Sequence, residues 1–241
     1  MSKLSFYKED NIKISYRYYK RGKKTLIFLH GLLSDMNGKK SIFLNNYCKK
    51  NNISYLCFDF QGHGQSSGVF TNFGISDWYK DLLNIINYLK IKNFILVGSS
   101  MGGWVAIVYA LMFPKKVTKL IGIAPAPDFT TNLIWRNFNE SQRNKIKNNK
   151  IVKVKVSSDF SCYYSPSLFK RSKAYLIKNI KGNYLGETIF IHGGKDKSVP
   201  YGYNDNFYFS KKFKNFKNII IKHADHSLSD QDSLEFLSKF I

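Results

Sequence analysis

The chain has 241 residues and a formal net charge of +22, from 38 lysines and arginines against 16 aspartates and glutamates. Hydrophobic residues make up 44% of the sequence, which is enough for a full core and excludes a disordered protein. Five prolines and 16 glycines without a repeating pattern exclude a collagen-like or low-complexity chain. The length predicts one domain, or two small ones.

The basic excess raises binding to nucleic acid or to an acidic surface as one interpretation. Only 5 of the 38 basic residues are arginine, although arginine supplies the bidentate contacts that nucleic-acid sites favour. The sequence also has no basic and aromatic platform with the regular spacing of an oligonucleotide-binding module. A compositional drift toward lysine and asparagine explains the charge without a polyanion, so nucleic acid is the less favoured partner.

The cysteines Cys48, Cys57 and Cys162 have neither the even number of a disulfide framework nor the close spacing of a zinc site. The first residues contain no apolar stretch followed by a cleavage site. No apolar run approaches the roughly 20 residues that cross a bilayer. We therefore expect reduced thiols, a cytoplasmic protein, no transmembrane segment and no metal site.

In chain order, apolar runs alternate with segments of helical periodicity. Alternating polarity predicts a strand near a sheet edge over residues 12–19. Continuous apolar runs predict strands buried on both faces over residues 25–31, 54–60, 93–98 and 117–124. Helical spacing predicts helices over residues 75–89 and 101–113, the second ended by Pro114. Later in the chain the same patterns predict strands over 188–194 and 217–222, and helices over 202–213 and 229–241.

This alternation predicts an α/β protein with a mostly parallel central sheet flanked by helices. Residues 128–181 break the pattern. We expect a core from residues 1–127 and 182–241, and an inserted lid over residues 128–181 at the carboxyl edge of the sheet, where such folds bind ligands. Aromatic residues of this segment could line an acyl channel or anchor the lid to the sheet, and the sequence leaves both open. They are Phe129, Trp135, Phe138, Phe160, Tyr163, Tyr164 and Phe169.

The string ILVGSSMGGW contains the pattern G-x-S-x-G, from Gly98 to Gly102, between a predicted buried strand and a predicted helix. In this context the pattern is typical of a nucleophile elbow, a sharp turn that presents a serine hydroxyl above the sheet. Ser100 is therefore the predicted nucleophile, because the neighbouring Ser99 does not lie between the two glycines. The alternative is an ordinary tight turn with a helix-capping serine.

A serine nucleophile needs a base, and the base needs an acid that orients it. In this architecture the chain order is serine, acid, histidine. His226, in the loop beyond the last strand, is the predicted base, and His223 at the strand end is the alternative. Asp196 follows the preceding strand and is the predicted acid. Asp225 is adjacent to His226 in sequence, which disfavours a geometry in which the two face each other. Asp128 is the other credible acid, although it fits better as a helix cap.

Acyl transfer also needs N–H groups directed at the developing oxyanion. We predict the backbone N–H of Met101 and that of Leu32, in the loop after the strand over 25–31. His30 suits a hydrogen bond that braces this loop. The string DFQGHGQSSG allows a tight turn but lacks the ending of a phosphate-binding P-loop. We expect its His63 at the surface or in a supporting role.

Together, these strings resemble the α/β-hydrolase superfamily, from about residue 24 to the end of the chain. The strings FLHGLLSDMNGKK, GSSMGGW, IHGGKDKSVP and KHADH resemble more narrowly the branch of mitochondrial acyl-protein thioesterases that also hydrolyse acyl glucuronides. The resemblance implies an α/β-hydrolase fold with a lid inserted after the sixth strand, and serine-dependent hydrolysis without a cofactor. It also implies catalytic roles for Ser100, Asp196 and His226.

We therefore expect a serine hydrolase that cleaves carboxylic esters or acyl thioesters through an acyl-enzyme, in a small molecule or an acylated protein. A catalytically silent binding protein on the same scaffold is the alternative, although a binding protein has no need of a complete catalytic set. A dehalogenase is disfavoured because it would carry aspartate at the position of Ser100. Residues 128–181 hold 12 basic and 3 acidic side chains, which favours attraction of an anionic substrate.

Overall fold

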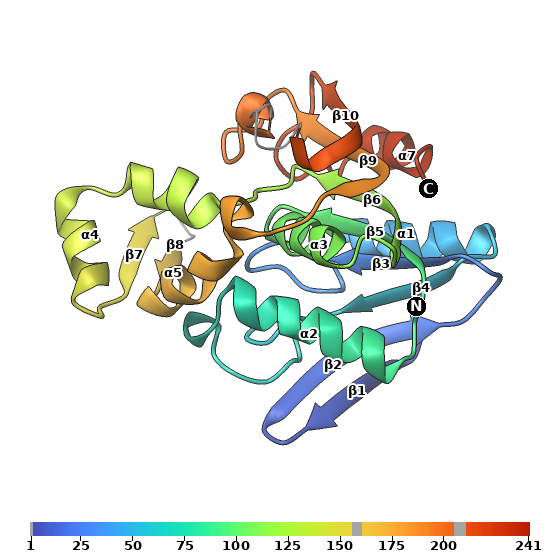
Figure 1. Ribbon diagram of the computed structural model, residues 1–241, viewed down its shortest axis with the longest axis horizontal. Coiled ribbons are helices and arrows are strands. Elements are labelled where there is room, and N and C mark those ends of the chain that lie inside the picture. The colour runs from blue at the N-terminus through green and yellow to red at the C-terminus, as the bar shows by residue number, and fades with distance from the viewer. Residues whose placement is uncertain (1, 156–160, 205–210) are drawn as a thin grey trace.

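The computed structural model describes residues 2–155, 161–204 and 211–241. Its strands are β1 (Leu4–Glu9), β2 (Ile12–Tyr19), β3 (Thr25–Leu29), β4 (Ser54–Phe58), β5 (Phe94–Ser99), β6 (Val117–Ile123), β7 (Val152–Lys155), β8 (Ser161–Tyr164), β9 (Tyr184–Gly193) and β10 (Phe213–Ile221). Eight of them form the central sheet, in the order β1-β2-β4-β3-β5-β6-β9-β10 (Figure 1). The pairs β1–β2 and β2–β4 are antiparallel, and every other neighbouring pair in this sheet is parallel. The predicted mostly parallel sheet is confirmed.

Helices cover both faces of the sheet, so the inner strands are buried on both sides (Figure 1). The helices are α1 (Lys39–Lys50), α2 (Ile75–Tyr88), α3 (Met101–Met112), α4 (Glu140–Lys147), α5 (Pro166–Ser172) and α7 (Gln231–Ser238). Along β3, Leu26 and Phe28 point into the core that includes residues of α1 and α7. Ile27 and Leu29 point into the core that includes residues of α2 and α3. Because successive side chains of such a strand are buried in different cores, every position is apolar, which explains the continuous apolar runs.

The elements predicted from the sequence differ from the observed ones mainly at their ends. β9 begins at Tyr184 and β10 at Phe213, each four residues before the predicted start. The predicted helix over 202–213 is only partly observed: residues 201–204 form a 3₁₀ turn, residues 211–212 are helical, and Phe213 begins a strand. Residues 205–210 of that prediction lie outside the described residues.

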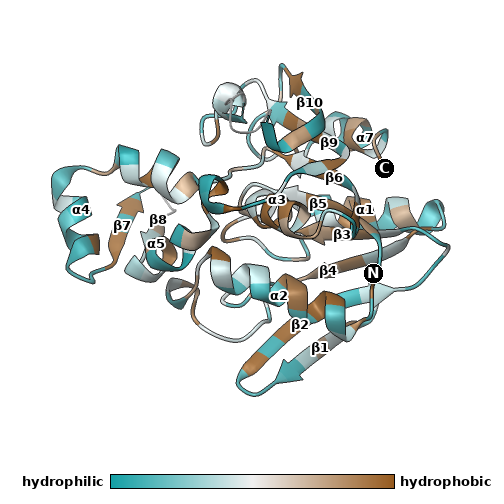
Figure 2. Cartoon of the chain, viewed as in Figure 1, coloured by the Kyte–Doolittle hydropathy of each residue, from teal (hydrophilic) through white to brown (hydrophobic). Residues whose placement is uncertain are grey.

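The 128–181 segment connects β6 to β9 and forms no part of the central sheet. It contains a short π-helical turn (Thr130–Trp135), α4, the antiparallel pair β7–β8, and α5. Figure 1 shows these elements together on one side of the central sheet. In Figure 2, α4 is coloured largely hydrophilic, unlike the central strands. None of the described helices combines the length and apolarity needed to cross a membrane.

Three of the described hydrogen bonds join the 128–181 segment to α2 and α3. The Arg171 guanidinium pairs with Asp77 of α2, with 2.7 Å between Nη1 and Oδ1. The indole N–H of Trp104, in α3, donates to the carbonyl oxygen of Tyr175 at 3.0 Å. The hydroxyl of Ser172 accepts a hydrogen bond from the N–H of Ile75, at the start of α2. The end of the segment is thus fixed to the two helices on one face of the sheet.

Candidate active site

Ser100 occupies a strained turn between β5 and α3. Its φ of 52° and ψ of −116° lie outside the regions that residues with a side chain prefer. A Cβ added to Gly98 would lie 2.3 Å from the carbonyl oxygen of Gly102, and one added to Gly102 would lie 2.4 Å from that of His30. The turn is therefore tight enough to require both glycines, and it presents the Ser100 side chain at the carboxyl end of β5.

The side chains of Ser100, His226 and Asp196 form a chain of hydrogen bonds. His226 Nε2 lies 3.1 Å from Ser100 Oγ, and His226 Nδ1 lies 2.7 Å from Asp196 Oδ2. The other oxygen of Asp196 accepts from the N–H groups of Ser198 and Val199, each at 2.8 Å. In a neutral imidazole, the carboxylate beside Nδ1 favours the proton on that nitrogen, which leaves the lone pair of Nε2 facing the hydroxyl. The structure brings together the three residues that the sequence singled out.

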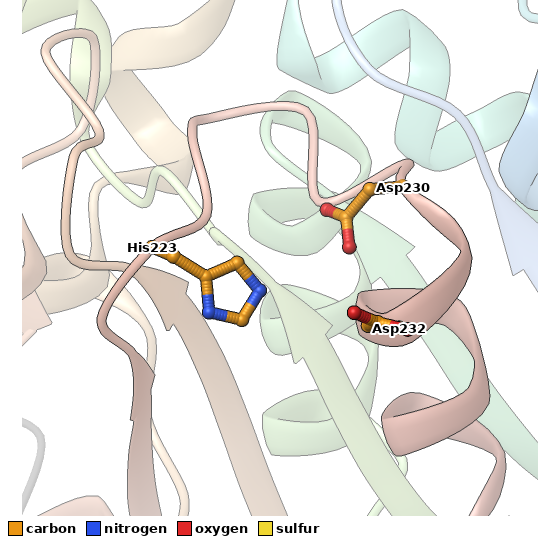
Figure 3. A group of neighbouring side chains, drawn as sticks. All are labelled: His223, Asp230 and Asp232. Atoms are coloured by element: carbon orange, nitrogen blue, oxygen red, sulfur yellow. The ribbon is translucent and has the colours of Figure 1, made fainter.

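His223, the alternative base, points toward Asp230 and Asp232 (Figure 3). One potential ligand atom from each lies within 4.8 Å of the others, and within the described part of the chain no other such group of three forms. All three residues are exposed. Asp230 already caps α7, accepting from the N–H and hydroxyl of Ser233. The role of Asp230 as the cap of α7 therefore explains why these side chains lie close together.

The two alternative acids are also engaged elsewhere. The Asp225 carboxylate accepts hydrogen bonds from Ser227 and Leu228, and the Ser227 hydroxyl in particular lowers its pKa. Asp128 accepts from the N–H of Ile177 at 2.9 Å, and burial raises its pKa to about 6. The prediction that Asp128 caps the helix that follows it is wrong, because its carboxylate links the two ends of the 128–181 segment instead.

The backbone N–H groups of Leu32 and Met101 are free beside Ser100. Neither donates a hydrogen bond to any acceptor among the described residues. Both residues border the same cavity as Ser100. A Cβ added to Gly31 would lie 3.3 Å from Ser100 Cβ, so the loop that carries Leu32 runs directly against the serine. Two unpaired donors at this point fit the requirement of an oxyanion site.

Asp59 braces the loop that carries Leu32, a role that the sequence analysis missed. Its buried carboxylate accepts from the N–H of Met36 at 2.7 Å and from the hydroxyl of Ser15 at 2.8 Å. It therefore joins the loop after β3 to β2 and to the turn after β4. Gly64 is required in that turn, because a Cβ there would lie 2.2 Å from Asp59 Oδ2. The spacing D-x-x-G-x-G, which begins at Asp59, is the feature of the sequence that could have indicated this role.

His30 and His63 are neighbouring buried imidazoles, with ring centroids 5.1 Å apart. His30 Nδ1 donates to the carbonyl oxygen of Gly31 at 2.8 Å, and Nε2 accepts from the N–H of Phe60 at 3.2 Å. This confirms the predicted bracing role of His30. His63 is 5% exposed and thus not at the surface, and its Nε2 has no hydrogen-bond partner within the described residues. Burial lowers the pKa of both histidines to about 4.

A cavity of about 510 Å³ lies between Ser100 and the 128–181 segment. We call it the apolar cavity. Phe129, Phe138 and Tyr164 line it, together with aliphatic side chains, whereas Trp135 and Phe169 pack behind Phe138. Phe129 also packs against Trp104 of α3, with 5.4 Å between the ring centroids, so it both lines the cavity and anchors the segment to the core. Tyr163 is exposed, and Phe160 lies outside the described residues.

Basic side chains of the 128–181 segment contribute little to this cavity. Lys155 lines it, and the other basic residues of the segment are absent from its described lining. A second lysine, Lys197, comes from the loop after β9. Elsewhere in the segment, Arg171 pairs with Asp77, and Arg143 bonds to backbone carbonyls. The charge of the segment is thus spread over its surface and is not concentrated at Ser100.

Residues 24–146 match the family model described as alpha/beta hydrolase fold, and the chain belongs to this family. A solved structure of a putative hydrolase from Agrobacterium vitis S4 matches with a TM-score of 0.89 at 24% identity. It covers 100% of this chain and 97% of that one, which supports the fold. The α/β-hydrolase fold predicted from the sequence is confirmed.

Among its relatives, the chain is similar to the mitochondrial palmitoyl-protein thioesterase ABHD10. It is 29% identical to the Rattus norvegicus protein over 238 residues, which cover 97% of this chain and 80% of the relative. The mouse protein's structure matches with a TM-score of 0.86 at 26% identity, covering 99% of this chain and 96% of that one. A putative esterase/lipase 2 from Mycoplasma genitalium is 28% identical over 197 residues, 77% of this chain and 73% of the relative. The resemblance to the thioesterase branch is confirmed.

These relatives contradict the cytoplasmic localisation expected from the sequence. The thioesterases that match 97% of the chain are named mitochondrial. The prediction was wrong because its main physical argument was the state of the cysteines. All three are buried and free, and free thiols fit a reducing environment without distinguishing one such compartment from another.

Proposed function

We propose that the chain is a serine hydrolase that cleaves carboxylic esters or acyl thioesters through an acyl-enzyme. Its family, and relatives named thioesterase and esterase/lipase, support hydrolysis of such bonds. The observation that carries the proposal is the hydrogen-bonded chain from Ser100 through His226 to Asp196, beside an apolar cavity.

In the acylation step, Ser100 Oγ attacks the carbonyl carbon while His226 Nε2 takes the hydroxyl proton. The carbonyl oxygen becomes an oxyanion and receives the free N–H groups of Leu32 and Met101. Asp196 stays ionised and stabilises the imidazolium through Nδ1. The intermediate collapses, His226 returns the proton to the departing thiol or alcohol, and the acyl group remains bonded to Ser100.

In the deacylation step, a water molecule takes the place of the departed group. His226 removes one of its protons as the oxygen attacks the acyl carbon, and the same two N–H groups hold the second oxyanion. Cleavage of the bond to Ser100 then releases the carboxylic acid and restores the serine hydroxyl. Every proton passes through His226, so this sequence of steps needs no additional acid or base.

The 128–181 segment serves as a lid in this proposal. Its side chains Phe129, Leu133 and Phe138 form much of the apolar wall that faces Ser100. An acyl chain buried there would contribute about 0.8 kcal/mol for each methylene removed from water. The substrate is then an ester or thioester of an apolar acid, in a small molecule or on an acylated protein, as the names of the relatives suggest.

Labelling with a fluorophosphonate tests the proposal directly. The wild-type protein should be labelled at Ser100 and should hydrolyse p-nitrophenyl esters, and Ser100→Ala should lose both. Ser238→Ala, which removes a hydroxyl in α7, serves as the matched control and should keep both. Absence of labelling and turnover in the folded wild-type protein, or turnover retained by pure Ser100→Ala, would falsify the proposal.

A further inference from the structure

A second cavity, of about 440 Å³, meets the apolar cavity at Ser100. Leu32, Ser100 and His226 border both cavities. The other walls of the second cavity come from the loop after β3, the start of α1 and the loop after β10. Their side chains are mostly polar and include Ser34, Asp35, Lys39, Lys40, Ser227 and Ser229. We call this the polar cavity.

The contrast between the two cavities matches the two halves of an acyl substrate. The carbonyl carbon must lie at Ser100 Oγ, so the acyl chain and the leaving group extend from that point into different spaces. Phe129, Leu133 and Phe138 give the apolar cavity walls that suit an acyl chain. Hydroxyl and ammonium groups give the polar cavity walls that suit a hydrophilic leaving group.

The two lysines of the polar cavity have N–H groups that are not used in hydrogen bonds with the described residues. The exposed Lys39 has no ion-pair partner within the described residues. Lys40 Nζ donates to the carbonyl oxygen of Ser227 and to the hydroxyl of Ser229, which leaves one of its three N–H groups. Asp35 is the one carboxylate in the described lining, and it accepts a backbone hydrogen bond from its own loop. Positive charge exceeds negative charge in this cavity.

We propose that the polar cavity is the leaving-group subsite and that it takes a thiol or alcohol bearing an anionic oxygen group, a carboxylate or a phosphate. This inference rests on the proposed hydrolase function and adds the substrate class. Lys39 and Lys40 bind the anionic group while the acyl chain occupies the apolar cavity. Lys39 determines the preference for an anionic leaving group, because its ammonium is not engaged by the protein.

The test compares three octanoyl thioesters that share one acyl chain. Octanoyl-CoA carries phosphates, S-octanoyl-glutathione carries carboxylates, and S-octanoyl-N-acetylcysteamine has a neutral leaving group. We expect the wild-type protein to have a higher kcat/KM for at least one anionic thioester than for the neutral one. Lys39→Gln should lower this ratio about fivefold through KM, as expected for a partly solvated charge pair. Lys39→Arg should restore the ratio, and added salt should lower it.

Lys80→Gln is the matched control, because it removes one exposed lysine from α2, outside both cavities. It should leave the ratio unchanged. An equal fall with Lys80→Gln, or an unchanged ratio with Lys39→Gln, would overturn the subsite and would leave the hydrolase function intact. Absence of wild-type turnover on all three thioesters and p-nitrophenyl esters, or turnover retained by Ser100→Ala, would instead overturn the hydrolase function. A larger effect on octanoyl-CoA or on S-octanoyl-glutathione would identify the anionic group as phosphate or carboxylate.

Discussion

His226 and Asp196 are thirty positions apart in the chain, and their side chains meet with 2.7 Å between Nδ1 and Oδ2. The carboxylate next to His226 in sequence, Asp225, turns instead to the N–H groups of Ser227 and Leu228. It thereby shapes the loop that carries His226. The carboxylate that contacts His226 therefore comes from the loop after β9, and the sequence neighbour makes other contacts.

The different roles of Asp196 and Asp225 can be tested with one variant of each. Asp196→Asn should lower kcat/KM for a p-nitrophenyl ester by a factor of about 10³–10⁴, because the amide no longer selects the tautomer with the proton on Nδ1. Asp225→Asn keeps an oxygen acceptor for the N–H groups of its loop and should change kcat/KM by less than about threefold. Similar losses in the two variants would contradict the assignment of Asp196.

The turn around Ser100 is so closely packed that adding one methyl group to it should strongly lower the stability of the fold. In Gly102→Ala, the new Cβ would lie 2.4 Å from the carbonyl oxygen of His30. We expect a loss of about 3 kcal/mol and a Tm at least about 5 °C lower in thermal unfolding. Gly38→Ala is the control, because its Cβ would meet its nearest neighbours at 3.6 Å. A Tm for Gly102→Ala within about 2 °C of the control would contradict the close approach.

The apolar cavity should set the length of the acyl group. Leu133 lines the cavity and is only partly buried, so Leu133→Trp should narrow the cavity without disturbing the core. We expect the ratio of kcat/KM for p-nitrophenyl decanoate over butyrate to fall about tenfold, as expected when a few methylenes lose their binding site. Ile151→Trp adds the same side chain at an exposed position of the segment and should leave the ratio unchanged. Equal ratios in the two variants would show that the acyl chain does not bind in the apolar cavity.

His63 should make the fold sensitive to acid. Its pKa is lowered to about 4 in the folded protein, mainly by burial and also by the neighbouring His30, against about 6.5 in the unfolded chain. Between these values the unfolded chain binds more protons, so stability falls as the pH falls from about 6.5 to about 4. Asp81 opposes this trend, because burial raises its pKa to about 7.

A comparison of variants isolates the contribution of His63. His63→Phe removes the imidazole from an aromatic cluster that includes Phe70 and Trp78. Its free energy of unfolding, measured in urea, should gain about 2 kcal/mol relative to the wild type between pH 6.5 and pH 4.5. His223→Phe alters an exposed histidine and should show no such gain. A constant difference between His63→Phe and the wild type across this range would contradict the lowered pKa.

The sequence predicted the central strands well, because each inner strand is buried on both faces and reads as an unbroken apolar run. It did not predict α1, whose buried side chains include Ser41 and Asn45 as well as Leu44 and Cys48. Such a polar helix has no clear apolar stripe, and its preceding residue, Gly38, offers no capping side chain. The four-residue strands β7 and β8 are too short for alternation to stand out.

The residues of the candidate site likewise fall into those that the sequence could predict and those that it could not. Ser100, Asp196 and His226 were predictable because each follows a recognisable strand, and the chain order of the roles is known for this architecture. Their catalytic roles remain predictions. The polar cavity was not predictable, because Lys39 and Ser229 are far apart in sequence and come together only where the start of α1 contacts the loop after β10. The bracing role of Asp59 likewise depends on contacts between separate strands.

Because the two cavities meet at Ser100, the first product and the acyl group would be held in separate spaces. The thiol or alcohol can depart while the acyl chain stays in place, and water then reaches the acyl carbon by the route that the first product has vacated. A second thiol entering that space would compete with this water and receive the acyl group. The same geometry therefore predicts a partition between hydrolysis and acyl exchange, measurable as new thioester when free glutathione is added during turnover.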